Sequence, residues 1–118
     1  MTLRGKRILV VEDEPIIGFA IEDMLEALGC VVVGMAHQLT PALELVAMRE
    51  FDAAVLDVNI GGETIYTVAD ALAAKGVPYI FATGYGDSLH PKAHLQAPTL
   101  TKPYTIDDLA DALLRYFG

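Results

Sequence analysis

Five short runs of mainly apolar residues recur along the chain. They read RILVV, VVVGMA, AAVLD, YIFAT and, less clearly, PTLT, and they span residues 7–11, 31–36, 53–57, 79–83 and 98–101. Near-continuous apolar runs of this length are typical of parallel strands that are buried on both faces. The pattern therefore predicts five strands of a parallel sheet.

Stretches with a helical period lie between and after these runs. In the first stretch the apolar residues share one stripe, Pro15 suits the first turn and Gly29 suits the end. The last stretch opens with the capping pattern Thr105-x-x-Asp108. The predicted helices span 15–28, 40–49, 66–76 and 105–117.

Strands that alternate with helices imply an open, doubly wound parallel sheet with right-handed crossovers and helices on both faces. We therefore predict an α/β fold, a three-layer αβα sandwich. One segment departs from the pattern, because GYGDSLHPKAHLQA at 84–97 contains two glycines and a proline. We expect either a short helix around 92–96 or a loop that orders only on binding.

Size and charge narrow the possible functions. With 118 residues, 53% of them hydrophobic and 20% charged, the chain has the composition of one globular domain. A net charge of −8 would repel a phosphate backbone, which argues against direct binding to nucleic acid. Cys30 has no second cysteine to pair with, and no segment approaches the length of a membrane span. These features predict a cytoplasmic domain in which Cys30 is a buried apolar residue.

Polar side chains gather where the predicted strands end. They are Glu12, Asp13 and Glu14 after the first strand, Asp57 and Asn59 at the third, Thr83 at the fourth and Lys102 at the fifth. In open α/β sheets, ligands bind at this carboxyl edge, near the point where the strand order reverses. Glu14 alone is explained as the cap of the next helix, but Asp13 and Asp57 would each leave a half-buried charge at the end of an apolar strand.

Such a cluster of acids requires a cation. Two carboxylates about 4 Å apart repel each other by roughly 4 kcal/mol at an effective dielectric constant of about 20, and Lys102 would neutralise only one of them. Carboxylate, amide and backbone carbonyl oxygens suit Mg²⁺ or Mn²⁺ better than Zn²⁺. A phosphate typically completes a partly filled magnesium shell. The cluster therefore predicts a metal site that also binds phosphate.

The stretch FATG at 81–84 fits the same site. A phosphoryl group bound there would need a hydroxyl donor and a positive charge, which Thr83 and Lys102 supply, and space for its donor, which Gly84 provides. Asp57, at the end of the middle strand, is then the candidate nucleophile. Its carboxylate would form an acyl phosphate.

Together these residues resemble the receiver domain of two-component response regulators, and the resemblance covers the whole chain. The motifs that carry it are VVEDE with Glu12 and Asp13, LDVN with Asp57, FATG with Thr83, and TKPY with Lys102. Each motif alone is weak, whereas their combination in this order is highly specific. The family implies a flavodoxin-like (CheY-like) sheet with strand order 2-1-3-4-5.

The resemblance also implies roles for individual residues. Asp57 is the phosphoacceptor, and Thr83 and Lys102 sense the phosphoryl group. Magnesium or manganese is held by Asp13, Asp57 and the backbone carbonyl of Asn59, with Glu12 in support. A cis peptide bond is expected between Lys102 and Pro103.

The run PYIFATGYGD and the motif KPY resemble the FATGUY subgroup of single-domain receivers, which is often paired with HWE-type histidine kinases in alphaproteobacteria. Receivers usually carry a Tyr or Phe three residues before the lysine as an aromatic switch, whereas this chain has Thr99 there. Tyr85 and Tyr104 are aromatic residues nearby. We hypothesise that switching comes instead from ordering of the segment 84–97, coupled through Tyr85.

The family implies partners as well. We expect a single receiver domain over residues 1–118, without an output domain, that takes a phosphoryl group from a sensor histidine kinase. It would signal through protein contacts or act as a relay intermediate or phosphate sink, with a histidine phosphotransferase or a downstream protein as second partner. The chain is expected to be a monomer or weak dimer, and the partner surface of receivers corresponds here to 89–96, 99–101 and 107–116.

We do not expect a conventional enzyme. The domain would catalyse its own phosphorylation and the hydrolysis of its acyl phosphate, with Asn59 and Tyr85 beside the route of the attacking water.

A haloacid-dehalogenase-type phosphatase is the alternative, but it needs a second acid where this chain has Asn59. A flavin carrier would need a phosphate-cradling first loop, and EDEP presents three negative charges instead. A pseudo-receiver would not need the acids, Thr83 and Lys102, and a metal pair of His90 and His94 is disfavoured by the proline between them.

Overall fold

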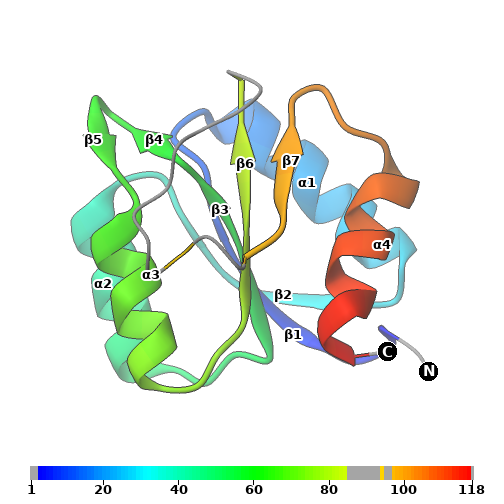
Figure 1. Cartoon of the computed structure of the whole chain (residues 1–118), viewed down its shortest axis with the longest axis horizontal. Coiled ribbons are helices and arrows are strands. Elements are labelled where there is room, and N and C mark those ends of the chain that lie inside the picture. The colour runs from blue at the N-terminus through cyan, green and yellow to red at the C-terminus, as the bar shows by residue number, and fades with distance from the viewer. Residues whose placement is uncertain (1–2, 85–93, 95–96, 118) are drawn as a thin grey trace.

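The computed structural model describes residues 3–84, 94 and 97–117, which Figure 1 shows as coloured ribbon. Its centre is a parallel sheet of five strands in the order β2-β1-β3-β6-β7. The strands are β1 Arg7–Val11, β2 Val31–Ala36, β3 Ala53–Asp57, β6 Tyr79–Thr83 and β7 Thr99–Thr101. Numbered among themselves these strands stand in the order 2-1-3-4-5, so the predicted fold class and sheet order are confirmed.

Four helices cover the two faces of the sheet, as Figure 1 shows, with α2 and α3 on one side and α1 and α4 on the other. The helices are α1 Pro15–Ala27, α2 Leu39–Met48, α3 Tyr66–Ala74 and α4 Ile106–Phe117. Two hydrophobic cores result, one on each face. All five residues of β3 are buried, because this strand lies in the middle of the sheet with helices above and below it. The three-layer sandwich predicted from the sequence is therefore confirmed.

A small hairpin was not predicted. Strands β4 Asn59–Ile60 and β5 Glu63–Thr64 pair antiparallel directly after β3. Gly61 and Gly62 form the turn with φ values of 59° and 84°, a conformation that two-residue hairpin turns require and that glycine adopts without strain. The pair of glycines was the available signal, but each strand has only two residues and therefore no readable alternation.

The helix ends test the predicted caps. At the start of α4 the Thr105 amide donates to the Asp108 carboxylate at 2.9 Å, and the Asp108 amide donates to the Thr105 hydroxyl at 3.1 Å. The predicted capping box is therefore confirmed. The capping interpretation of Glu14 is wrong in one respect, because Glu14 occupies the cap position of α1 but its side chain makes no capping hydrogen bond.

Other predictions concern single residues and one segment. Cys30 is buried, and burial raises the pKa of its thiol, as expected of an apolar residue rather than a reactive one. The peptide bond between Lys102 and Pro103 is cis, as the family implies. None of the helices in the described part of the chain has both the length and the apolar surface needed to cross a lipid bilayer. The proposed helix around 92–96 lies outside the described residues, apart from His94.

Candidate functional site

The carboxyl ends of β1 and β3 bring three acids together. Val11 and Leu56 are partners in the parallel ladder, so the next residues of the two strands, Glu12 and Asp57, emerge side by side. Oxygen atoms of Glu12, Asp13 and Asp57 all lie within 4.8 Å of one another. Glu12 and Asp57 are buried, and Asp13 is partly exposed. The structure thus places the predicted acids in one cluster at the edge where the strand order reverses.

Lys102 joins this cluster from the end of β7. Its ammonium nitrogen lies 2.7 Å from Glu12 Oε1 and 3.3 Å from Asp57 Oδ2, and its backbone amide donates to the Thr83 carbonyl at 2.7 Å. Lys102 thus contacts two carboxylates, but its single positive charge offsets only one of them, as expected. Burial lowers the pKa of Lys102, but the hydrogen bond to Glu12 and the charges of Asp57 and Glu12 outweigh burial and raise it.

The pKa values of the two aspartates diverge. Burial, reinforced by the hydrogen bond and charge of Glu12, raises the pKa of Asp57 from 3.8 to about 7, although Lys102 opposes the shift. Burial also acts to raise the pKa of Asp13, but the amide of Gly61 and its other hydrogen bonds lower it overall. Of the two aspartates, Asp57 is therefore the one whose ionised form the fold disfavours, mainly through burial.

The donor set fits a hard divalent cation. Three carboxylates face one ammonium group, so the cluster keeps excess negative charge at a partly buried position. Each acid offers an oxygen ligand, and the described residues place no cysteine or histidine side chain in this group. Oxygen-only donors suit magnesium or manganese and do not favour zinc. The Mg²⁺ preference deduced from the sequence is therefore consistent with the geometry.

A cavity of about 450 Å³ opens over the acids. It is lined by Asp13, Glu14, Ile17, Asp57, Asn59, Gly62, Gly84 and Lys102. The Asn59 amide donates to Asp57 Oδ1 at 3.4 Å, which places β4 beside the acid cluster. A Cβ added at Gly84 would meet no described atom within 4 Å. The cavity gives a group bound to Asp57 access from solvent.

Thr83 is buried at the carboxyl end of β6, next to the strand that carries Asp57. Asp57 pairs with Ala82 in the ladder, and Thr83 follows directly, so the two lie at the same edge. Thr83 in turn pairs with Thr101, the residue before Lys102. The register thus brings the predicted hydroxyl, carboxylate and ammonium groups to neighbouring strand ends.

Two further contacts at this edge were not predicted. His37 lies in the bend after β2, and its Nδ1 is 2.8 Å from the Glu12 carbonyl oxygen, to which it donates because a carbonyl cannot donate. Gly61, in the unpredicted hairpin, donates its amide to Asp13 at 3.3 Å. His37 directly follows β2, so its position at the carboxyl edge was the signal that could have identified it.

Of the residues expected to take part in switching or partner contact, Pro103 and Tyr104 lie beside α1, whereas Thr99 lies in the sheet. Pro103 and Tyr104 line a second, mainly apolar cavity of about 410 Å³ with Lys102 and α1 residues, namely Ile17, Ala20, Ile21 and Met24. The Tyr104 hydroxyl is buried without a hydrogen-bond partner in the described part of the chain. Burial, with smaller effects of Glu12 and Asp57, raises the pKa of this phenol. Thr99 pairs with Phe81 in the sheet, and Tyr85 lies outside the described residues.

Comparison with known proteins gives a consistent result. The family model described as response regulator receiver domain matches residues 8–114. SdrG from Sphingomonas melonis Fr1 is 42% identical, with a TM-score of 0.84 over the whole of both chains. The receiver domain of sensor histidine kinase PA1611 from Pseudomonas aeruginosa, solved with magnesium coordinated in its active site cleft, is 26% identical, with a TM-score of 0.78 over 97% of this chain and 98% of that one.

A curated relative is longer than this chain. The phyllosphere-induced regulator PhyR of Methylorubrum extorquens is 35% identical over 66% of this chain, and the match covers 30% of PhyR. The matched part of the chain therefore corresponds to less than a third of the length of that relative.

Proposed function

The chain belongs to the response regulator receiver family of two-component signalling, and from this we propose that it takes a phosphoryl group onto Asp57 and transmits the signal by protein contact. The observation that carries the proposal is that oxygen atoms of Glu12, Asp13 and Asp57 lie within 4.8 Å of one another, with the Lys102 ammonium group in contact with two of these acids. Family membership removes the support for the phosphatase and flavin-carrier alternatives. We place this activity in the cytoplasm.

In the proposed reaction the Asp57 carboxylate attacks phosphorus while the bond between phosphorus and the donor histidine breaks. Magnesium held by Asp13, Asp57 and the Asn59 carbonyl, with Glu12 in support, would supply positive charge to the transferring oxygens. Lys102 contacts Asp57, and its ammonium group would bind a phosphoryl oxygen. The Thr83 hydroxyl would donate a hydrogen bond to another phosphoryl oxygen. Gly84 lines the cavity over Asp57 and, having no side chain, would leave space for the phosphodonor.

The same site would limit the lifetime of the acyl phosphate. Asn59 lines the cavity over Asp57, and its backbone amide donates to the Asp57 carboxylate, so its side chain would stand beside the route of an attacking water. Tyr85, the other residue proposed to flank this route, lies outside the described part of the chain. We propose that hydrolysis returns the domain to its starting state without a separate phosphatase.

The direct test is incubation with a small phosphodonor such as acetyl phosphate. We expect the intact mass to rise by one phosphoryl group when Mg²⁺ is present and to stay unchanged in EDTA, because three carboxylates would otherwise repel the anionic donor. Mn²⁺ should replace Mg²⁺, since both accept oxygen ligands. No gain in mass with either ion would contradict the proposal.

The expected kinase partner needs a surface next to the acids, and α1 provides one. Ile16 is 83% exposed and Phe19 is also exposed, although both are large apolar side chains on α1. Ile17, between them, lines the cavity over Asp57 and also the apolar cavity beside Pro103 and Tyr104. We propose that the phosphodonor protein, an HWE-type kinase or a histidine phosphotransferase, packs on this continuous surface.

Replacing Ile16 with glutamate should separate docking from chemistry. We expect phosphoryl transfer from a phosphorylated HWE-type kinase to slow by about tenfold or more, since burying an isoleucine contributes about 1.5–3 kcal/mol. Labelling by acetyl phosphate should keep its normal rate, because Ile16 does not line the cavity over Asp57.

Met48→Glu is the matched control, since Met48 is also 83% exposed but lies at the end of α2. Transfer to this variant should match transfer to the wild type. Equal slowing of both variants would mean that added negative charge, rather than loss of the α1 contact, is responsible.

A further inference from the structure

Four rings pack together on the face of β6 that α3 covers. They belong to Tyr66 of α3, Tyr79 and Phe81 of β6, and His94. The imidazole stacks on Tyr66 with centroids 5.7 Å apart and meets the rings of Tyr79 and Phe81 edge to face at 5.6 and 6.0 Å. His94 is 3% exposed, so it is part of the core although it follows a segment rich in glycine and polar residues.

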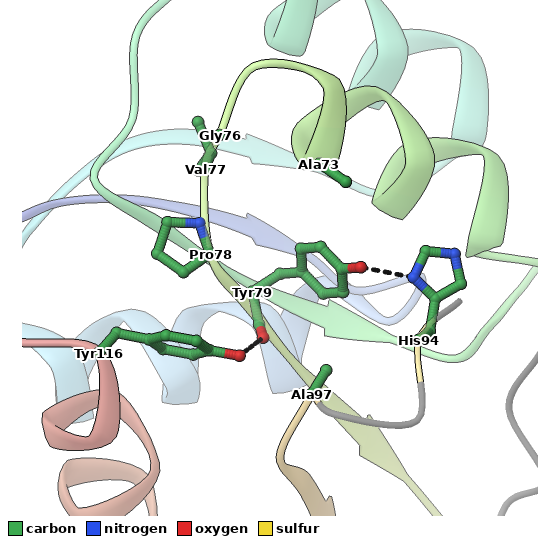
Figure 2. Close-up of a pocket in the computed structure, with 8 residues that line it drawn as sticks. All are labelled: Ala73, Gly76, Val77, Pro78, Tyr79, His94, Ala97 and Tyr116. Atoms are coloured by element: carbon green, nitrogen blue, oxygen red, sulfur yellow. Dashed lines mark hydrogen bonds between the residues drawn. The ribbon is translucent and has the colours of Figure 1, made fainter. Parts of the chain in front are cut away.

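Both nitrogens of His94 are hydrogen-bonded. Figure 2 shows its Nδ1 facing the Tyr79 hydroxyl, and Nε2 lies 2.7 Å from Asp70 Oδ1. A carboxylate cannot donate, so Nε2 carries the hydrogen and Nδ1 accepts from the phenol. The side chain of Asp70 is 67% exposed, whereas Tyr79 is buried, and burial together with the Asp70 charge raises the pKa of Tyr79. The network therefore runs from the strand through the histidine to the surface of α3.

This network shares a face of the sheet with the candidate phosphoryl-binding hydroxyl. Residues two apart in a strand point to the same side, so Tyr79, Phe81 and Thr83 form one row. Thr99 lies opposite Phe81 in β7 and has a short side chain. His94 is one of three described rings that pack against Phe81, together with Tyr66 and Tyr79, so a displacement of Thr83 that moves Phe81 would reach His94.

His94 also has space in which to move. A cavity of about 460 Å³ borders its ring, and Figure 2 shows Tyr116 at the other side of this cavity from His94. Turning into this cavity would break the bond to Tyr79, whose buried hydroxyl would then lose its partner. Because unpaired buried groups cost free energy, the network favours two discrete arrangements over a continuous shift.

Resting on the proposed phosphorylation of Asp57, we propose that His94 is the group that reports this modification on the α3 face. In the unmodified protein His94 is held by Tyr79 and Asp70. When Thr83 binds the phosphoryl group, the row through Phe81 is displaced and His94 exchanges these hydrogen bonds. The exchange would free the Asp70 carboxylate from His94 and so alter the exposed surface of α3, which a partner protein can contact.

Histidine side-chain NMR tests the exchange in the full chain, with beryllofluoride and Mg²⁺ as the phosphoryl mimic. We expect the His94 Nε2 proton to be protected in the free protein and to shift or vanish when the mimic is added. His37 bonds to Glu12, so its signal reports occupation of the acid site independently. A shift at His37 with an unchanged His94 would overturn the inference and leave the proposed function standing. No response at either residue, together with no gain in thermal stability, would instead count against the proposed function.

Variants then test whether His94 carries the response. His94→Phe keeps a ring and removes both hydrogen bonds, and we expect the mimic-induced change in amide exchange along Tyr66–Ala74 to fall by at least about fivefold, the lower end of usual coupling. The thermal shift caused by the mimic should remain, because the acid site is intact. An unchanged exchange response in His94→Phe would refute the role.

Asp70→Asn provides a second variant if His94→Phe does not fold. It preserves size and exposure but removes the charge that fixes the histidine tautomer, so the exchange response should fall in the same direction. Asp111→Asn on α4 is the matched control, since it removes an exposed helical carboxylate away from His94 and should respond as the wild type. Equal responses of Asp70→Asn and the wild type would also contradict the proposal.

Discussion

Replacing Asp57 with asparagine is expected to abolish labelling by acetyl phosphate. The amide keeps the size of the side chain but has no charged oxygen to attack phosphorus, and it removes one of the three acids that attract the metal. The wild type should gain one phosphoryl mass in Mg²⁺ and the variant none, measured by intact mass spectrometry at equal protein and donor concentrations.

The other end of the same strand offers a control for this substitution. Asp52 directly precedes β3, accepts the Arg7 amide at 2.7 Å and pairs with the Arg7 side chain at 3.3 Å. Asp52→Asn makes the same chemical change at the opposite edge of the sheet, so it should be labelled like the wild type. Labelling of Asp57→Asn at the wild-type level would show that another residue is the phosphoacceptor.

The metal-free wild type is expected to lose stability as the pH rises from about 4 to about 7. Asp57 has its pKa raised from 3.8 to about 7 in the folded protein, mainly by burial, whereas in the unfolded chain it titrates near 3.8. Below the lower value both states bind the proton and the stabilising contribution is complete. Above the higher value both have lost it and the contribution is gone. The upper limit of the change is about 4 kcal/mol, at about 1.36 kcal/mol per pKa unit.

Urea unfolding of the wild type and Asp57→Asn over this pH range measures the effect, and EDTA keeps both proteins free of metal. Other groups titrate too, and Asp13 and Asp52 have lowered pKa values that act in the opposite direction. The informative quantity is therefore the free energy of unfolding of the wild type minus that of Asp57→Asn. This difference should fall as the pH rises. Saturating Mg²⁺ should remove the trend, because the ion favours the ionised carboxylate. A difference that stays constant with pH would show that Asp57 keeps an ordinary pKa.

Most of the architecture could be predicted because it rests on local signals. The strands β1, β2, β3 and β6 begin and end where their apolar runs do, since a strand covered on both faces has little use for polar residues. The fifth strand begins one residue later than expected, at Thr99. The capping box at Thr105 and Asp108 was likewise readable, because its partners are three residues apart. The hairpin escaped prediction because it is held by its turn and by one pair of short strands.

The site divides in the same way. The acids, Thr83 and Lys102 could be placed at one edge because parallel strands all end there. How they pair could not be predicted. Lys102 contacts both Glu12 and Asp57, and the Glu14 side chain makes no capping hydrogen bond to α1. The bond of His37 to Glu12 and the network around His94 were not predicted either, since each joins residues 15 to 25 positions apart.

The order of residues alone thus specified the layered sheet, its carboxyl edge and the chemical groups available there, because these follow from continuous apolar runs for the buried strands and from a period of about 3.6 residues for the helices. Packing of distant segments decided the rest. It raised the pKa of Asp57, shared Lys102 between two acids and buried His94 between a strand and a helix. Hydrogen bonds and desolvation depend on which side chains meet across the fold, and that pairing exists only once the core has formed.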